Sequence, residues 1–170
     1  PAPLDPQEPD NIARSIQLLK LRHAVITSVD RDDVDDLGAS HWVKVIQKVK
    51  EVNPEVTMEV LIPDFQGRKE LIQQVIDARP DVISHNLETV KRLSDRVRSR
   101  ATYPVSLEVI KQVADSGIVS KSGIMLGLGE TKDEILETMD DLRGVGCKVM
   151  TIGQYLQPTA KNLEVKEYVT

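Results

Sequence analysis

Short runs of apolar residues alternate along this chain with segments of helical periodicity, and this alternation limits the possible folds more than any other feature. The runs begin near residues 24, 57, 82, 121 and 148, and apolar residues at helical spacing follow each of the first four. Such alternation predicts βαβ units and a parallel sheet. Because βαβ crossovers are right-handed, every helix would cover one face if the sheet curls into a barrel.

The number of units predicts a partial barrel. A complete eight-unit barrel needs about 250 residues, whereas this chain has 170 and begins with a helical segment that no strand precedes. We therefore expect an α/β fold in a single domain over residues 1–170, namely a partial (βα)6 barrel whose first strand is missing. A doubly wound sheet is the alternative, and periodicity alone does not separate the two.

Periodicity and its breakers also predict where the elements begin and end. Asp5 is expected to cap the first helix, because Pro6 and Glu8 follow at favoured positions. Gly117 is expected to follow the end of a later helix. The predicted helices span about residues 6–22, 38–51, 68–78 and 132–143, with another starting near 104, and the predicted strands span about 24–29, 57–62, 82–85, 121–127 and 148–156.

The stretch from Lys121 to Glu130 predicts a buried strand that runs into a glycine turn and then a helix. Its consecutive apolar residues at 124–126 suit a strand covered on both faces. Gly127 and Gly129 allow positive φ and a close approach by a ligand. Residues 131–134 match a capping box, and free N–H groups at that helix start could hold a polar or anionic group. The alternative is a tight turn whose glycines serve geometry only.

Composition argues against several classes of function. The chain is 40% hydrophobic and 29% charged, which is typical of an ordinary globular protein. Its net charge of −5 argues against a nucleic-acid surface, which needs a basic stripe. No apolar run approaches the ~20 residues of a membrane span, and no signal peptide is visible. Because the chain begins with Pro1 rather than Met, we expect a processed protein or a piece of a longer one.

Cysteine and histidine residues do not form a metal-binding pattern. The single cysteine, Cys147, excludes an internal disulfide and a multi-cysteine metal site within these residues, and we expect its thiol in the core. His23 is expected to end a helix, His41 to begin one and His85 to end a strand. The chain also lacks a nucleophile elbow, a P-loop and a zinc pattern.

Polar residues follow the carboxyl ends of the predicted strands, where parallel α/β folds bind ligands. Asn86 and Glu88 would point the same way on an extended exit, and an amide with a carboxylate suits a pair of ribose hydroxyl groups. Capping of the loop is the alternative. The full set of strand-end residues is Thr27, Ser28, Asp30, Pro63, Asp64, Asn86, Glu88, Gly127, Gly129, Glu130, Gln154, Tyr155 and Gln157.

Several strings at these positions resemble one family. They span nearly the whole chain in the right order and resemble lipoyl synthases, which are members of the radical S-adenosylmethionine (SAM) superfamily. The strings are PLD (3–5), ITSVDRDD (26–33), EVL (59–61), PDF (63–65), HNLET (85–89), KSGIMLGLGET (121–131) and TIGQYLQP (151–158).

The resemblance implies an enzyme with a partial (βα)6 barrel, SAM and two 4Fe–4S clusters. One cluster would cleave SAM reductively to a 5′-deoxyadenosyl radical. That radical would remove hydrogen atoms from carbons six and eight of a protein-bound octanoyl chain. The auxiliary cluster would supply the two sulfur atoms of the lipoyl product.

The same resemblance implies partners and a compartment. The octanoyl chain would sit on a lysine of a lipoyl carrier protein or domain, such as the glycine cleavage H protein or the E2 subunit of a 2-oxoacid dehydrogenase. A ferredoxin or flavodoxin would donate electrons, and neither nucleic acid nor membrane is an expected partner. The default location is a bacterial cytoplasm, although a plastid or mitochondrial enzyme would look the same.

The cluster ligands depart from the family pattern. The C-x3-C-x2-C loop of the first cluster is expected just upstream of Pro1, and the auxiliary ligands further upstream and beyond Thr170. Cys147 matches none of them, and one thiolate cannot hold a cluster that expects cysteine ligation. We therefore expect no metal ligand within this chain and no activity from its 170 residues alone.

The resemblance also implies where SAM would be bound. Ser28, with Thr27 and Asp30, would approach the amino and carboxylate groups of its methionine part. Asn86 and Glu88 would contact the ribose and the methionine end.

The other implied contacts come from the last two strands. Lys121 would offer its charge to the carboxylate. The glycine motif would support the adenine, and backbone groups after the last strand would bind the adenine edge. These two sets are Gly127, Gly129 and Glu130, and then Gln154, Tyr155 and Leu156.

Three other readings compete with this one. A radical SAM enzyme of biotin synthase type would share the barrel and the glycine strand, but not the strings at 85–89 and 153–158. A truncated barrel could act only as a scaffold. An aldolase-type barrel would need a catalytic lysine or metal at the mouth, and Lys121 lies too near the start of its strand for a Schiff base.

Overall fold

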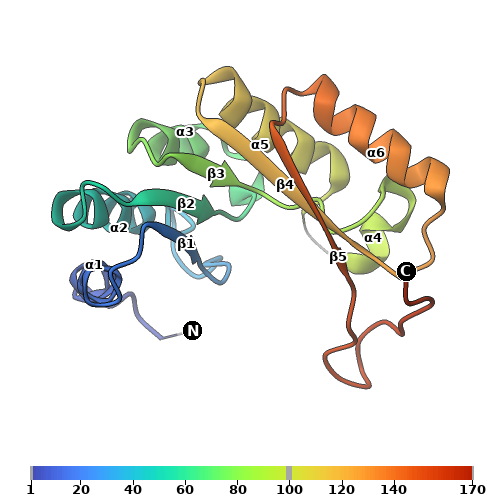
Figure 1. The fold of residues 1–170 in the computed structure, drawn as a ribbon, viewed down its shortest axis with the longest axis horizontal. Helices are drawn as coiled ribbons and strands as arrows, with labels where there is room; N and C mark the ends of the chain where they lie inside the picture. The colour runs from blue at the N-terminus through green and yellow to red at the C-terminus, as the bar shows by residue number, and fades with distance from the viewer. Residues whose placement is uncertain (1, 99–100, 170) are drawn as a thin grey trace.

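The computed structural model describes residues 2–98 and 101–169, and one parallel sheet forms its centre. The strands are neighbours in the order β1-β2-β3-β4-β5. They span His23–Thr27 (β1), Thr57–Leu61 (β2), Val82–Ser84 (β3), Val119–Leu126 (β4) and Val149–Gln154 (β5). A doubly wound sheet would reverse its order at a switch point, and this sheet does not. The sheet curls into half of a barrel (Figure 1), which confirms the predicted partial barrel.

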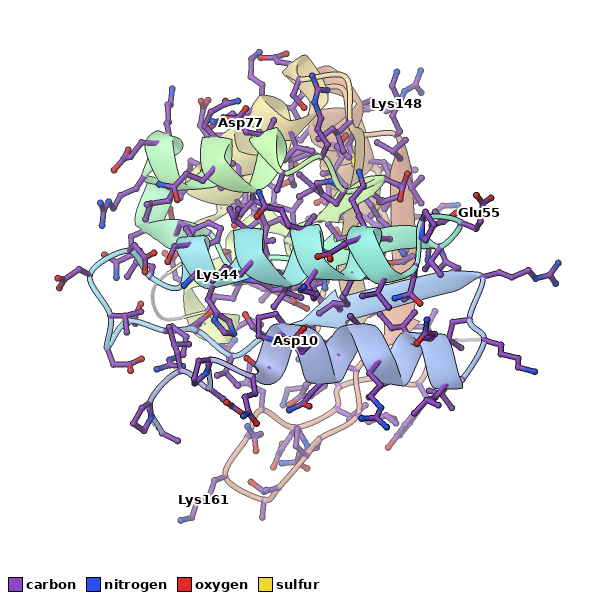
Figure 2. The ribbon with its side chains drawn as sticks, turned by 90° about the vertical axis from the view of Figure 1, so that its left-hand side faces the viewer. Asp10, Lys44, Glu55, Asp77, Lys148 and Lys161 are labelled. Carbon is purple, nitrogen blue, oxygen red and sulfur yellow. The ribbon has the colours of Figure 1, made fainter. Side chains whose placement is uncertain are left out.

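Helices cover the convex face of the sheet (Figure 1). Three of them, α1, α2 and α3, lie side by side there, and Figure 2 shows Asp10 on α1 and Lys44 on α2. The helices span Glu8–Leu18 (α1), Ala39–Val52 (α2), Lys69–Asp77 (α3), Ser94–Val97 (α4), Tyr103–Asp115 (α5) and Lys132–Gly144 (α6), with single 3-10 turns at Phe65–Gly67 and Lys91–Leu93. Within the described part of the chain, no helix has the length and hydropathy needed to cross a membrane.

Strand side chains alternate between the helix layer and the inside of the half-barrel, which we call the lumen. Met58, Val60 and Ile83 point into the main core under the helices and are at most 1% exposed. Each such burial stabilises the fold by roughly 1.5–3 kcal/mol. Val25, on the lumenal face of β1, is 56% exposed. The apolar packing that stabilises the fold therefore lies on the convex side of the sheet, under the helices, and the lumen can hold polar groups.

The first helix is shorter than predicted. It begins at Glu8 with Gln7 as its N-cap, so the prediction of Asp5 as N-cap is wrong. The Asp5 carboxylate instead accepts a hydrogen bond from the backbone N–H of Gln7 at 2.8 Å and closes the preceding turn. At the other end the chain leaves the helix through Lys20, whose φ is +51°. His23 is therefore the first residue of β1 rather than the end of a helix.

Other predicted helix ends are confirmed. The Thr131 hydroxyl accepts from the Glu134 backbone N–H at 3.3 Å, and the Glu134 carboxylate accepts from the Thr131 N–H at 2.7 Å. This is the predicted capping box at the start of α6. Gly117 follows α5 with φ +82°, while Gly127 and Gly129 have φ values of +100° and +101° after β4. A side chain is disfavoured at each of these three glycines.

Candidate functional site

The carboxyl ends of β1, β2 and β3 surround a cavity of about 310 Å³, which we call the mouth cavity. Small-molecule sites occupy roughly 300–1,000 Å³, so its size suits a small ligand. The predicted site residues that line it are Thr27, Ser28, Asp30, Asn86 and Glu88. Pro63, which also belongs to the predicted strand-end set, lines the cavity as well, and the remaining lining residues are Leu61, Ile62, His85 and Arg98. Three separate strand exits are thus brought together.

Asn86 lies against the inner face of β4 because Gly123 has no side chain. A Cβ atom on Gly123 would lie 3.0 Å from Oδ1 of Asn86 and 2.6 Å from Oγ1 of Thr151. Both distances are shorter than ordinary van der Waals contact, so this position needs glycine for space. From the sequence, close approach was expected at Gly127 and Gly129 but not at Gly123.

The chain turns sharply at Glu88 and then pairs with β4. Glu88 has φ +67°, its N–H donates to the carbonyl of Gly123 at 3.0 Å, and its carbonyl accepts from the N–H of Met125 at 2.9 Å. A left-handed conformation costs a non-glycine residue roughly 1–3 kcal/mol, and these two backbone hydrogen bonds hold it in place. The predicted extended exit is therefore wrong, although Asn86 and Glu88 do line the same cavity.

Arg98, at the end of α4, brings a positive charge to the mouth cavity. Its Nη1 donates to the carbonyl of Asn86 at 2.9 Å and to Oγ of Ser106 at 2.8 Å. Burial lowers the pKa of the Arg98 guanidinium from its ordinary value, and the Glu88 carboxylate opposes that shift. A guanidinium stays protonated in proteins. Arg98 was not among the predicted site residues, because no local sequence pattern links the end of α4 to the exit of β3.

His85 was predicted to end its strand, but β3 ends at Ser84, so His85 is the first residue after it. It is buried at 3% exposure. Its Nδ1 lies 2.9 Å from the carbonyl oxygen of Ile62, and its Nε2 lies 2.9 Å from Oγ of Ser106. Burial lowers the pKa of His85 to about 4. The ring is therefore neutral near pH 7, and both of its nitrogens face protein atoms.

Lys121 does not line the mouth cavity, because a carboxylate in the lumen binds its ammonium group. Its Nζ lies 2.9 Å from Oε1 and 3.0 Å from Oε2 of Glu59, and Glu59 also accepts from Oγ of Ser84 at 2.7 Å. Burial raises the pKa of Glu59, but the hydrogen bonds from Lys121 and Ser84 outweigh it and leave the pKa below its ordinary value. The positive charge of Lys121 is thus paired with the Glu59 carboxylate inside the half-barrel.

The glycine turn after β4 binds its own chain. The N–H groups of Gly127 and Leu128 donate to the Glu130 carboxylate at 2.6 and 2.9 Å. The carbonyl of Gly127 accepts from the N–H of Lys166 at 2.7 Å. These contacts use N–H groups that a ligand would need, so they favour the geometric interpretation of the turn. Gly127, Gly129 and Glu130 are not lining residues of the mouth cavity.

The segment after β5 folds back over this turn. The Gln154 side-chain amide donates to the carbonyl of Glu167 at 3.1 Å. The Tyr155 hydroxyl donates to the carbonyl of Leu163 at 2.8 Å, and Leu156 is 66% exposed. The side chains of Gln154 and Tyr155 therefore anchor the C-terminal segment, and none of the three predicted residues lines the mouth cavity.

The described residues do not fit an iron–sulfur cluster. Among them, no group of three or more His, Cys, Asp or Glu side chains is arranged to hold a metal ion. Cys147 comes just before β5, at the amino end of that strand, and its Sγ lies 3.3 Å from the carbonyl oxygen of Val149. Burial raises the pKa of this thiol, which disfavours the thiolate that a cluster requires.

Curated relatives match the chain over almost its full length. A protein of Treponema denticola named lipoyl synthase is 70% identical over 169 residues, which are 99% of this chain and 58% of that protein. The lipoyl synthase of Phocaeicola vulgatus is 66% identical over 170 residues, which are 100% of this chain and 60% of that protein. The chain thus spans about three fifths of the length of these relatives.

Solved structures share the fold at low identity. A methylornithine synthase matches with a TM-score of 0.72 at 12% identity, over 90% of this chain and 44% of that one. A cobalamin-dependent SAM radical enzyme matches with a TM-score of 0.51 at 13% identity, over 80% and 21% of the two chains. The Radical SAM superfamily matches residues 1–142. Because that match covers most of the sequence, this chain belongs to the radical SAM superfamily.

Proposed function

We propose that this chain is the SAM-binding half-barrel of a lipoyl synthase. The observation that carries the proposal is identity of 66–70%, over at least 99% of the chain, to proteins named lipoyl synthase. The activity of the whole protein would be sulfur insertion at carbons six and eight of an octanoyl chain held on a carrier protein. This reaction class needs SAM and an iron–sulfur cluster.

The mouth cavity fits SAM by charge. SAM carries an ammonium group, a sulfonium and a carboxylate. The cavity presents the carboxylates of Asp30 and Glu88 together with the guanidinium of Arg98. Opposite charges arranged in this way favour one orientation of a zwitterionic ligand. The space that Gly123 leaves beside Asn86 keeps an amide available at the same wall.

Each part of SAM then has a proposed partner. We assign the carboxylate to Arg98 instead of Lys121, because Lys121 is paired with Glu59. The proposed partners of the ammonium group are Thr27, Ser28 and Asp30, and those of the ribose are Asn86 and Glu88. The adenine would extend toward the ends of β4 and β5, where the backbone at Gln154, Tyr155 and Leu156 offers the candidate contacts. The turn at Gly127, Gly129 and Glu130 would shape this wall without donating to the ring, because the N–H groups of Gly127 and Leu128 already donate to Glu130.

When bound, SAM and a reduced cluster supply the 5′-deoxyadenosyl radical that removes hydrogen atoms from the octanoyl chain. The residues described above bind and orient SAM, which is the protein's contribution to such chemistry. The proposal includes two 4Fe–4S clusters, held by residues other than those described. It also includes an octanoylated H protein or E2 domain as substrate, a ferredoxin or flavodoxin as electron donor, and a cytoplasmic location.

The test uses the full-length protein, purified and reconstituted without oxygen. We expect about eight irons per chain, as two four-iron clusters require. With reductant, SAM and an octanoylated carrier domain, we expect 5′-deoxyadenosine and a carrier whose mass shows two added sulfur atoms. Two reactions serve as controls: one run without excluding oxygen, and one with a carrier that lacks the octanoyl group.

Other outcomes point to other proteins. Deoxyadenosine without sulfur insertion into the octanoyl carrier would reject lipoyl synthase and favour another radical SAM sulfur-inserting enzyme, such as one of biotin synthase type. A reconstituted protein that binds no iron and forms no deoxyadenosine would leave only the scaffold interpretation.

A further inference from the structure

A chain of hydrogen bonds leads from the body of the half-barrel to the guanidinium in the mouth cavity. His85 bridges the carbonyl of Ile62 and the hydroxyl of Ser106, with both ring nitrogens at 2.9 Å from their partners. The same hydroxyl accepts from Nη1 of Arg98 at 2.8 Å, and Nη1 also donates to the carbonyl of Asn86 at 2.9 Å. His85 and Ser106 are 3% and 0% exposed, so water does not compete for these bonds.

Only one arrangement of hydrogen atoms satisfies every member of this chain. The carbonyl of Ile62 can only accept, so the proton of the neutral His85 ring is on Nδ1. Nε2 is then an acceptor, and the hydroxyl of Ser106 must donate its hydrogen to it. The lone pairs of the Ser106 oxygen are left facing Arg98. A neutral His85 thus fixes the direction in which Ser106 presents its acceptor.

Arg98 needs such a restraint because carboxylates surround it. Glu88, Asp64 and Asp30 are close enough to favour its charged form. Among the described residues, however, its hydrogen bonds go to the neutral oxygens of Asn86 and Ser106. A free guanidinium would form a bidentate pair with one of these carboxylates and would occupy the cavity itself. Both of its hydrogen bonds use Nη1, so the N–H groups on Nη2 and Nε stay available for a ligand.

We propose that His85 and Ser106 are positioning residues that hold Arg98 aimed into the mouth cavity as the binding group for a ligand carboxylate. The proposal rests on the proposed function, because SAM is the ligand whose carboxylate Arg98 would bind. Neither His85 nor Ser106 contacts the carboxylate. They act through Arg98, by keeping its guanidinium off the neighbouring carboxylates before SAM arrives.

The test compares the binding of SAM and of decarboxylated SAM to the reconstituted full-length protein, without reductant, by calorimetry. Ser106→Ala should weaken SAM binding about 10- to 150-fold, which corresponds to the loss of a hydrogen bond to a charged group. It should leave the binding of decarboxylated SAM within about two-fold of wild type. Ser106→Cys, which keeps the volume but hydrogen-bonds weakly, should act in the same direction and serves if Ser106→Ala folds poorly.

Two further variants separate positioning from general damage. In an Arg98→Ala background, Ser106→Ala should cause no additional loss, because residues that act through one another are not additive. Ser120→Ala is the matched control: Ser120 is 1% exposed and its hydroxyl donates to the carbonyl of Gly146 at 3.3 Å, outside the mouth cavity. It should change neither affinity.

The outcomes distinguish this proposal from the proposed function. If wild-type protein binds SAM and Ser106→Ala binds it equally well, the positioning role is rejected and the SAM site stands. Equal losses for both ligands, or full additivity with Arg98→Ala, would show a merely structural serine and would also reject it. If wild-type protein does not bind SAM, the proposed function and this inference both fail.

Discussion

The ammonium nitrogen of Lys121 on β4 lies 2.9 Å from a carboxylate oxygen of Glu59 on β2, inside the lumen of the half-barrel. The side chain of Glu59 is 7% exposed and that of Lys121 is 25% exposed, so the pair is much more buried than a surface ion pair. The strand between them contributes Ser84, whose hydroxyl donates to the same carboxylate. Three neighbouring strands are therefore joined by one polar cluster on the face that lacks apolar packing.

Removing the lysine should destabilise the protein strongly. We expect Lys121→Met to lower the free energy of unfolding of the full-length protein by about 2–4 kcal/mol, because it removes the ammonium group from a buried carboxylate. Only the half-exposed imidazole of His23, at 3.7 Å, would remain as a basic neighbour of Glu59 among the described residues. The partial exposure of Lys121 keeps the effect below that of a fully buried pair. Urea unfolding measures it. The double variant Glu59→Gln/Lys121→Met should recover a large part of the loss, and a single-variant cost under about 0.5 kcal/mol would contradict the argument.

The same cluster predicts an acid dependence of stability. The pKa of Glu59 is lowered in the folded protein from its ordinary value of 4.5. A carboxyl group with a depressed folded pKa contributes stability above its unfolded pKa, and that contribution is lost as pH falls through the folded pKa. Glu59→Gln should therefore differ most from wild type near neutral pH, and the difference should shrink below about pH 4.5. A difference in unfolding free energy that stays constant with pH would exclude this role.

Gly123 offers a test of the cavity wall with a control in the next strand. Gly123→Ala places a methyl group 2.6 Å from Thr151 Oγ1 and 3.0 Å from Asn86 Oδ1, which should cost about 1–3 kcal/mol by overpacking and weaken SAM binding by displacing Asn86. Gly153→Ala on β5 meets nothing within 4 Å and should be near neutral in both unfolding and binding assays. Adding Thr151→Ala should restore part of the stability but not of the affinity. Equal effects of the two glycine substitutions would contradict this account.

The fold was predictable because it depends on the local periodicity of apolar residues and on the general rule for how βαβ units connect. Alternating strands and helices predict parallel βαβ units, and strand order then follows chain order in a barrel. The errors in the predicted secondary structure lie at the ends of helices and strands, where the backbone conformation of a single residue decides the boundary. The first helix ends early because the chain turns at Lys20 with φ +51°, and a lysine is not a residue that signals such a conformation.

The site was predictable only where it lies at strand ends. Asn86 and Glu88 could be placed beside the mouth cavity from the sequence, because carboxyl ends of parallel strands converge. Arg98 and Ser106 could not be placed there, because they come from the end of α4 and from α5, and only the packing of these helices brings them to His85. Lys121 was assigned to the carboxylate because nothing in the sequence links it to Glu59, which lies 62 positions away in the chain.

Gln154 should control how firmly the C-terminal segment is held on the sheet. Its amide nitrogen donates to the carbonyl of Glu167 at 3.1 Å, and its Oε1 accepts from the N–H of Val169 at 3.0 Å. Gln154→Ala removes these two bonds to the segment, together with the bonds from the same amide nitrogen to the carbonyls of Leu126 and Tyr155. We therefore expect about 5- to 30-fold faster proteolysis within that segment, the effect of losing about one to two kcal/mol of local stability. The urea midpoint of the whole protein should change little, because such a segment opens locally. Gln157→Ala, which removes one bond to the carbonyl of Asn162, is the control, and an equal rate in the two variants would show that Gln154 does not anchor the segment.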